Sequence, residues 1–273
     1  MLILALDTTT RAGSLAISRD GVLVSEMAGD PATSHAQRLP LDVNRICASA
    51  GLRLSDIELF AVAAGPGSFT GLRVGISSIQ GLAFATGRAV VPVSTLEAIA
   101  VSSGVEEGRP VAAWMDAQRH QVFAQLFAPE AVVQPFRAAD DPVAQPDAVV
   151  QAVRAAEAFT AASSGGALKG RTATPITDAL AATPEEVLTL WQPPSSLAGV
   201  AFRGDGAVKY ADVIRAALGD GADVADHVPP LAGAVARIAA AHASRAVRPH
   251  AVAAIYVRRP DVELARERRS GGG

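Results

Sequence analysis

The sequence predicts an α/β fold of two similar lobes with a cleft between them. Two observations support this prediction. Patterns typical of strand, hairpin, helix, strand and helix follow one another in the first hundred residues, and a second strand pair, followed by a helix-rich region, begins after residue 110. The chain has 273 residues and a mass of 27.9 kDa, which suffices for one large α/β domain or two small ones.

The first lobe opens with strands. Residues 2–6 are apolar, and Asp20-Gly21 separates two further apolar stretches. Because both residues accept a positive φ, this dipeptide predicts a tight hairpin. Residues 39–50 then show an amphipathic pattern and predict a helix. A buried strand over 59–64 and a helix of small and apolar residues over 72–86 complete the pattern.

The glycine-rich, acidic segment 102–110 marks the boundary between the lobes. Just before it, Ser94 and Glu97 have the spacing of a capping box and predict a short helix. Beyond it we expect paired strands over 111–115 and 121–127, helices over 148–158, 207–218 and 231–247, and strands over 200–202 and 253–257. We therefore assign residues 1–103 to the first lobe, 104–228 to the second, 229–258 to a return to the first, and 259–273 to a polar tail.

Composition and charge exclude several classes of protein. Hydrophobic residues make up 49% of the chain, which excludes global disorder. No apolar run approaches the roughly 18 residues of a membrane-spanning helix, and the N-terminus lacks the pattern of a secretory signal, so we expect a cytoplasmic protein. The net charge of −3 gives no argument for nucleic-acid binding, and the single Cys47 excludes an intramolecular disulfide.

The tripeptide Asp7-Thr8-Thr9 comes directly after the first strand. A carboxylate and two hydroxyls at a strand end can orient a nucleotide phosphate or a metal-bound water. The same residues also form ordinary turns, in which their side chains bond to the local backbone. The tripeptide by itself leaves both interpretations open.

The segment Gly65-Pro-Gly-Ser-Phe-Thr-Gly71 joins a strand to a helix. Its glycines allow close approach of the backbone, and a helix N-terminus attracts anions, so the segment can hold a phosphate. Alternatively, the glycines only allow the two elements to pack tightly. Neither Lys169 nor Lys209 stands inside this loop, so it is not a P-loop of the Walker type.

The helix after this loop carries small residues three and four positions apart, namely Gly71, Gly75, Ser78 and Gly81. Small side chains at this spacing let another helix come close. That helix can belong to the same chain or to a partner subunit.

The histidines show no metal-binding pattern. None of the five forms a pair with the spacing of a helix-borne metal site; they are His35, His120, His227, His242 and His250. We therefore expect no metal centre. The arginines between residues 258 and 269 alternate with acidic residues, which suits a solvated tail or a contact with RNA phosphates or an acidic partner.

Several motifs, taken in order, resemble the TsaB (YeaZ-type) family of bacterial tRNA threonylcarbamoyladenosine biosynthesis. They are LILALDTTT, SHAQRLP, GPGSFTGLRVGISSIQGLAFATG, PVSTLEAIA, MDAQRHQVF and IYVRRP. The resemblance covers most of residues 1–127 and the end of the chain, and it is faint between residues 129 and 196. It implies an actin-like, sugar-kinase-like (ASKHA) fold of two ribonuclease-H-like lobes.

The resemblance also implies a role and partners. Family members act as non-catalytic scaffolds for the paralogue TsaD, which modifies tRNAs that read ANN codons and carries the metal-binding histidines and the nucleotide. An ATPase subunit, TsaE, completes the assembly, tRNA is reached through the complex, and the family forms homodimers when alone. No cofactor is required, although weak or partner-dependent ATP or ADP binding fits the fold.

By resemblance, the partner surface uses the helices expected over 39–50 and 72–86. The candidate contact residues are Leu41, Arg45, Arg73, Gly75, Ile76, Ser78, Ile79 and Gln80. The tripeptide Asp7-Thr8-Thr9 takes the position that binds phosphate in active relatives, and we expect this site to be degenerate and not catalytic.

Three other functions remain as alternatives. The first is an ATP-dependent small-molecule kinase of the same fold, for which Asp116 or Asp205 could act as the base. The second is a metallopeptidase, which the missing histidine pairs disfavour. The third is a self-assembling interaction module that works as a homodimer.

Overall fold

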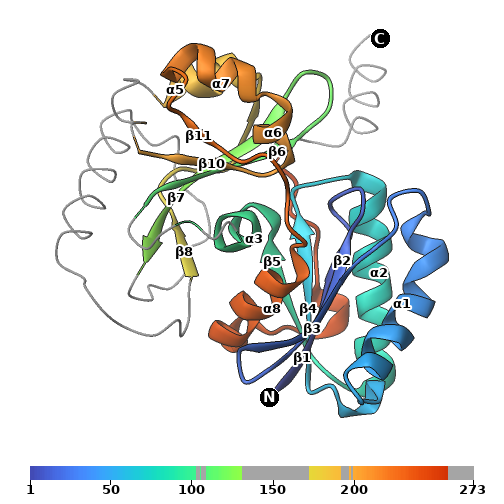
Figure 1. The fold of residues 1–273 in the computed structure, drawn as a ribbon. Helices are drawn as coiled ribbons and strands as arrows, with labels where there is room; N and C mark the ends of the chain where they lie inside the picture. The colour runs from blue at the N-terminus through green and yellow to red at the C-terminus, as the bar shows by residue number, and fades with distance from the viewer. Residues whose placement is uncertain (103–104, 106–108, 131–171, 192–196, 198, 258–273) are drawn as a thin grey trace, which may run out of the picture.

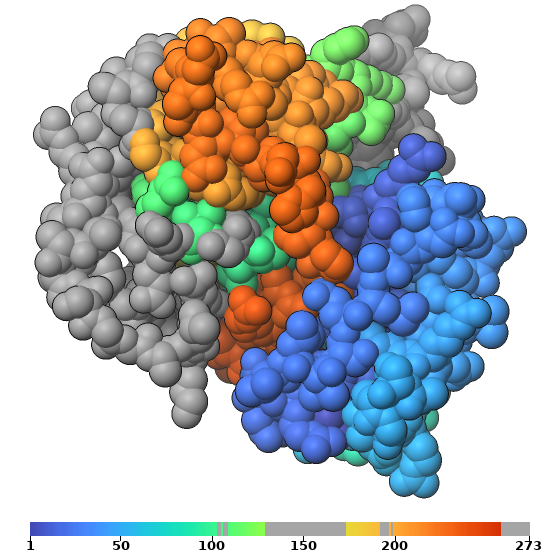
Figure 2. Space-filling view, in the orientation of Figure 1, coloured from blue at the N-terminus to red at the C-terminus, as the bar shows by residue number. Residues whose placement is uncertain are grey.

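The computed structural model describes residues 1–102, 105, 109–130, 172–191, 197 and 199–257. The predicted helix over 148–158 and the predicted tail over 259–273 lie outside this part of the chain. Figure 1 shows two lobes, each built on one sheet. In Figure 2 the early residues, drawn in blue, gather in one lobe, while the later residues from green to orange gather in the other.

The first sheet has five strands in the order β3-β2-β1-β4-β5. Their bounds are β1 Leu2–Asp7, β2 Ser14–Arg19, β3 Val22–Ala28, β4 Leu59–Gly65 and β5 Val90–Ser94. Strands β1, β2 and β3 pair antiparallel, whereas β4 runs parallel to both β1 and β5. The predicted hairpin turn is confirmed, because Asp20 and Gly21 both have a positive φ, of 52° and 79°.

Helices cover both faces of the first sheet (Figure 1). On one face, α1 (His35–Ser49) and α2 (Phe69–Thr86) bury apolar side chains such as Ile46 and Ile79 against Leu4 and Leu6 of β1. On the other face, α8 (Ala232–Ala241) packs Val235 and Ile238 against the opposite side of the same strands. Alternation of side chains along β1 therefore supplies two separate cores.

The second sheet repeats the plan of the first. Its path is β8-β7-β6-β10-β11, with β9 also paired to β7. The bounds are β6 Val111–Asp116, β7 Val122–Glu130, β8 Thr172–Pro175, β9 Leu180–Ala182, β10 Ala201–Arg203 and β11 Asp223–Val224. The first three strands of the path are again antiparallel and the last two again parallel. Identical order and sense in both sheets confirm the two-lobed, ribonuclease-H-like fold.

The second lobe carries α5 (Pro184–Leu190), α6 (Asp205–Lys209) and α7 (Ala211–Leu218). A cluster of buried aromatic rings fills the core between this sheet and α5 and α7: Trp114 lies 5.5 Å from Phe202 and 6.2 Å from Trp191 between ring centroids. Helix α3 (Thr95–Ser102) joins the lobes, because Ala98 and Val101 belong to the first core while Leu96 and Ile99 pack against the second sheet.

Three sequence predictions of secondary structure are corrected. The helix expected over 207–218 is divided between α6 and α7, which meet at Tyr210. The helix expected over 231–247 ends at Ala241 and continues as a 3-10 turn over Ala243–Arg245. The strand expected over 253–257 is not formed; the segment makes a single backbone bond of strand type, from Ile255 N–H to the Ala64 carbonyl at 2.7 Å, among the described residues. The predicted lobe boundaries at residues 103, 228 and 258 remain predictions.

Candidate functional site

The turn after β1 uses its polar side chains internally. The Asp7 carboxylate accepts hydrogen bonds from the Thr9 backbone N–H at 2.8 Å, the Thr9 hydroxyl at 2.5 Å and the Thr10 hydroxyl at 2.7 Å. The side chain of Thr8 donates to the Gly71 carbonyl at 2.7 Å. Asp7, Thr8 and Thr9 are all buried. In this arrangement the three residues form a closed Asx-type turn.

Helix α2 closes the space above this turn. A Cβ atom on Gly71 would overlap the Thr8 carbonyl oxygen, and one on Gly67 would come within 2.6 Å of the Thr9 side chain. The Ser68 hydroxyl caps the helix by accepting from Gly71 N–H at 3.3 Å. The glycines of this loop therefore bring the helix onto the strand end by close packing, as the structural interpretation of the loop predicts.

The segment 34–40 holds a buried arginine. Arg38 pairs with Asp42 at 2.8 Å, donates to the Ala12 carbonyl, and donates to Nδ1 of His35 at 2.8 Å. Its guanidinium fills the space beside Gly29, where any Cβ atom would overlap it. Burial and the Arg38 charge lower the pKa of His35, so its ring stays neutral and accepts this hydrogen bond. His35 thus holds the loop before β2 against α1.

The corresponding turn of the second lobe follows β6. The Asp116 carboxylate pairs with Lys209 of α6 at 2.8 Å and accepts from Gln118 N–H at 3.0 Å. Asp205 is largely buried and accepts from Asp116 N–H at 3.0 Å. Burial, with the nearby Asp116 charge, raises the pKa of Asp205. Both carboxylates proposed for the kinase alternative therefore have partners within the chain.

An exposed apolar surface lies across α1 and α2. Phe84 is 82% exposed and Leu41 is 58% exposed, although most large apolar side chains of both helices are buried. Gly81 lies one turn before Phe84 on the solvent side of α2, with open space where a Cβ atom would be. The helix surface defined by Leu41, Arg45, Ser77, Gly81 and Phe84 is called the α1–α2 surface below.

The structure divides the predicted partner residues into three groups. Leu41, Arg45 and Arg73 are exposed, and Ser78 and Gln80 are partly buried. Gly75, Ile76 and Ile79 are buried on the side of α2 that faces the sheet, and as contact residues they stay predictions. The exposed members remain predictions.

Ser77 and Phe84 of the α1–α2 surface were not singled out in the sequence, whereas Gly81 was named among the small residues of this helix. Ser77, Gly81 and Phe84 follow Arg73 at intervals of three and four, so one helix face carries all four. The sequence could have indicated this face, because Arg73 must point to solvent from an otherwise apolar helix. The residues three and four positions further along then lie on the same exposed side.

The C-terminal segment meets the first turn of α2. The Tyr256 and Phe69 rings lie 6.0 Å apart, and the Arg73 guanidinium lies 4.0 Å above the Phe69 ring. All three side chains are exposed. They form a cationic and aromatic group beside the α1–α2 surface.

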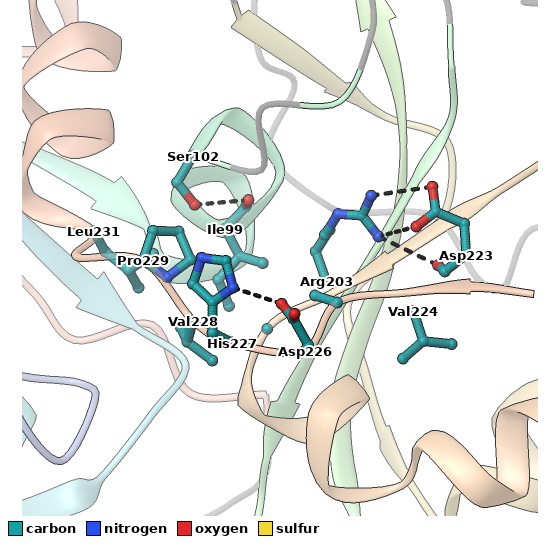
Figure 3. A pocket seen from close by; sticks show the side chains of 12 residues that line it. Ile99, Ser102, Arg203, Asp223, Val224, Asp226, His227, Val228, Pro229 and Leu231 are labelled. Atoms are coloured by element: carbon teal, nitrogen blue, oxygen red, sulfur yellow. Dashed lines mark hydrogen bonds and ion pairs between the residues drawn. The ribbon is translucent and has the colours of Figure 1, made fainter.

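A pocket of about 450 Å³ opens between α3 and the segment that joins β11 to α8 (Figure 3). Its floor is apolar, with Ile99 and Leu231 from the lobe junction. At its rim Arg203 holds Asp223 through two hydrogen bonds of 2.9 and 3.1 Å, and this arginine lowers the pKa of Asp223. Since the rim charges neutralise each other, the pocket presents no free charge from this pair.

The described residues contain neither a metal-binding cluster nor a membrane-spanning helix. No group of three or more His, Cys, Asp or Glu side chains in this part of the chain is placed to hold a metal ion. Among the described helices, none has both the length and the apolar character needed to cross a membrane.

The sequence is similar to that of known proteins over its first half. The family model of TsaD, tRNA N6-adenosine threonylcarbamoyltransferase, matches residues 29–137. The tRNA threonylcarbamoyladenosine biosynthesis protein TsaB of Haemophilus influenzae is 35% identical over 139 residues, which are 50% of this chain and 58% of that protein. The TsaB protein of Escherichia coli is 39% identical over 124 residues, 45% of this chain and 53% of that protein. The matched stretch thus spans little more than half the length of these relatives.

Structural similarity extends over nearly the whole chain. A crystal structure of an uncharacterized Pseudomonas aeruginosa protein, described as similar to peptidase YeaZ, superposes with a TM-score of 0.67 and 26% identity. The superposition covers 94% of this chain and 99% of that one. The agreement therefore includes the second lobe, where the sequence comparison with the curated relatives ends.

Proposed function

We propose that the chain is a TsaB/YeaZ-type protein and acts as a non-catalytic scaffold for a TsaD-type transferase in tRNA threonylcarbamoyladenosine biosynthesis. It would bind the transferase in its active conformation and shift the population toward that state by mass action. The chemistry would take place on the transferase. We place the working complex in the cytoplasm.

The α1–α2 surface is the observation that carries this proposal. Phe84 is almost fully exposed, and the neighbouring Gly81 leaves open space for a second helix. An exposed aromatic beside small residues is typical of an interface centre that a partner covers. Leu41 and Arg45 extend the same surface onto α1.

The TsaD-type partner is supported by the sequence match. The matched residues 29–137 include α1 and α2, so a TsaD-type chain carries a similar helix pair. Two similar helix pairs can meet face to face about a near two-fold axis, as two copies of one chain do. A homodimer of this chain and its complex with the transferase would then use the same surface and compete for it.

The absence of a catalytic role is supported by the two strand ends. Asp7 is buried and accepts three hydrogen bonds from its own turn, and α2 packs directly over Thr8. Asp116 is paired with Lys209. A general base must come within reach of its substrate, whereas Asp7 is buried in its own turn and Asp116 is held by Lys209. Any binding of ATP or ADP would accordingly be weak or depend on the partner, and no cofactor is required.

The test is a reconstituted transfer reaction. Purified TsaD and the ATPase TsaE are supplied with tRNA, threonylcarbamoyl-adenylate and ATP, with and without this chain. We expect strong dependence on this chain and no transfer by this chain alone. Equal transfer in its absence, with both partners active and from the same organism, would contradict the scaffold function.

A further inference from the structure

The C-terminal residues 247–256, called the C-terminal strap, run antiparallel along the whole of α2. Val247 pairs with Val90, just beyond the end of the helix. The Gln80 amide donates to the Val252 carbonyl at 3.2 Å in the middle. Tyr256 reaches Phe69 at the first turn, so the strap and α2 form one continuous face.

This face has an unusual charge distribution. Neither residues 59–96, which contain α2, nor residues 228–260, which contain the strap, include an aspartate or a glutamate. Exposed arginines lie along it, namely Arg73, Arg88 and Arg248, and His250 of the strap is exposed as well. The whole chain carries a net charge of −3, so the absence of acidic residues from these two segments makes this face positive relative to the rest of the molecule.

The acidic residues that flank residues 59–96 are already engaged. Glu58, just before β4, accepts from Leu2 N–H at 2.6 Å and lies 3.7 Å from the N-terminal amine. Glu97 on α3 pairs with Arg245 at 3.3 Å. Arg73, Arg88 and Arg248 appear in none of the ion pairs found among the described residues, so their charges remain available to a ligand.

One end of the face carries flat rings. Tyr256 is 45% exposed and Phe69 is 38% exposed, and Arg73 stacks on the latter. Nucleobases can stack on exposed aromatic rings. A row of arginines can bind the phosphates of the nucleotides that follow along the strand. An acidic polypeptide would use the arginines but would have no need of the rings.

We propose that Arg73, Arg88, Arg248 and His250, with the rings of Phe69 and Tyr256, form a binding strip for single-stranded RNA. Helix α2 has 18 residues and is therefore about 27 Å long. That length suits a site of about four nucleotides, the lower end of known single-strand sites. The strip shares the exposed side of α2 with the α1–α2 surface, and its argument does not rest on the scaffold function proposed above.

Fluorescence anisotropy of a labelled single-stranded oligoadenylate, titrated with the isolated chain, tests the strip. Three arginine contacts predict a fall in affinity of about 20-fold between about 50 and 200 mM salt. Arg248→Glu should weaken binding and reduce the salt slope by about one. The matched control is Arg215→Glu, which makes the same charge change at an exposed site on α7 and should bind as the parent does.

The rings are tested separately. Tyr256→Leu should weaken binding by at least about 5-fold, whereas Tyr256→Phe, which keeps the ring, should bind as the parent does. Thermal unfolding checks that each variant is folded. The proposal is overturned if Arg215→Glu weakens binding as much as Arg248→Glu, or if polyglutamate displaces the RNA and Tyr256→Leu binds normally. The first result would indicate bulk charge, and the second an acidic protein partner.

Discussion

The side-chain hydroxyl of Thr8 lies where a Cβ atom on Gly75 would stand. Thr8 lies in the turn that follows β1, and Gly75 lies in the second turn of α2. Because Gly75 has no methyl group, the helix and the end of the strand can come into contact. The neighbouring Gly71 carbonyl accepts the Thr8 hydrogen bond at 2.7 Å. This contact fixes which side of α2 packs on the end of β1, and the other side of the helix therefore faces solvent.

The first prediction compares two glycines of α2. Gly75→Ala should lower the free energy of unfolding by about 1–3 kcal/mol, because the new methyl group overlaps Thr8 in a tightly packed site. Gly81→Ala should raise it by about 0.5–1 kcal/mol, because that position is open and alanine favours the helix. Urea unfolding measures both. Equal changes at the two positions would contradict the packing described for α2.

A second prediction concerns the start of α8. The buried Ser14 hydroxyl on β2 accepts from the backbone N–H groups of Leu231 and Ala232, at 3.1 and 3.0 Å. Ser14→Ala would leave both groups unsatisfied and should cost about 1–3 kcal/mol of stability. Ser34→Ala is the matched control, because Ser34 precedes α1 without bonding to its backbone through the side chain. A shift of less than about 0.5 kcal/mol is expected there. Similar losses for both variants would show that Ser14 does not cap α8.

A third prediction concerns pH. Burial raises the folded-state pKa of Asp205 above its unfolded value of 3.8, so the stability that this group contributes is complete below that value. It is lost as the pH rises through the folded pKa. Asp205→Asn keeps an acceptor for Asp116 N–H and removes the buried charge. The variant should match the parent near pH 3.5 and exceed its melting temperature at pH 7. If the melting temperatures of Asp205→Asn and the parent differ by the same amount at all pH values, the buried charge of Asp205 is not the cause of the difference.

Much of the first lobe was predictable because its signals are local. Asp20 and Gly21 both tolerate the positive φ that the hairpin turn requires. The spacing of apolar residues within 39–50 indicates which side of α1 is buried. Apolar runs identify β1 and β4 without reference to the rest of the chain. The repeated strand order of the second lobe arises from long-range pairing and was expected only from the similarity of the patterns.

The errors have a common physical origin. The apolar residues 253–257 resemble a strand, but they lie over Gly65 and α2 and bond to the last residues of β4 only through Ile255 N–H in the described structure. The family resemblance and the helical position also placed Gly75 on the predicted partner surface. Which side of a small-residue helix faces solvent depends on tertiary packing, and here Thr8 occupies the space beside Gly75.

The most direct test of the central claim is the affinity of the isolated chain for a TsaD-type transferase, measured for two matched variants by calorimetry. Phe84→Glu places a charge on the α1–α2 surface, whereas Leu190→Glu does so at an exposed leucine of α5. We expect Phe84→Glu to weaken binding by at least about 30-fold without lowering the melting temperature, and Leu190→Glu to bind as the parent does. Equal affinities of the parent and Phe84→Glu would contradict the claim that this surface holds the transferase.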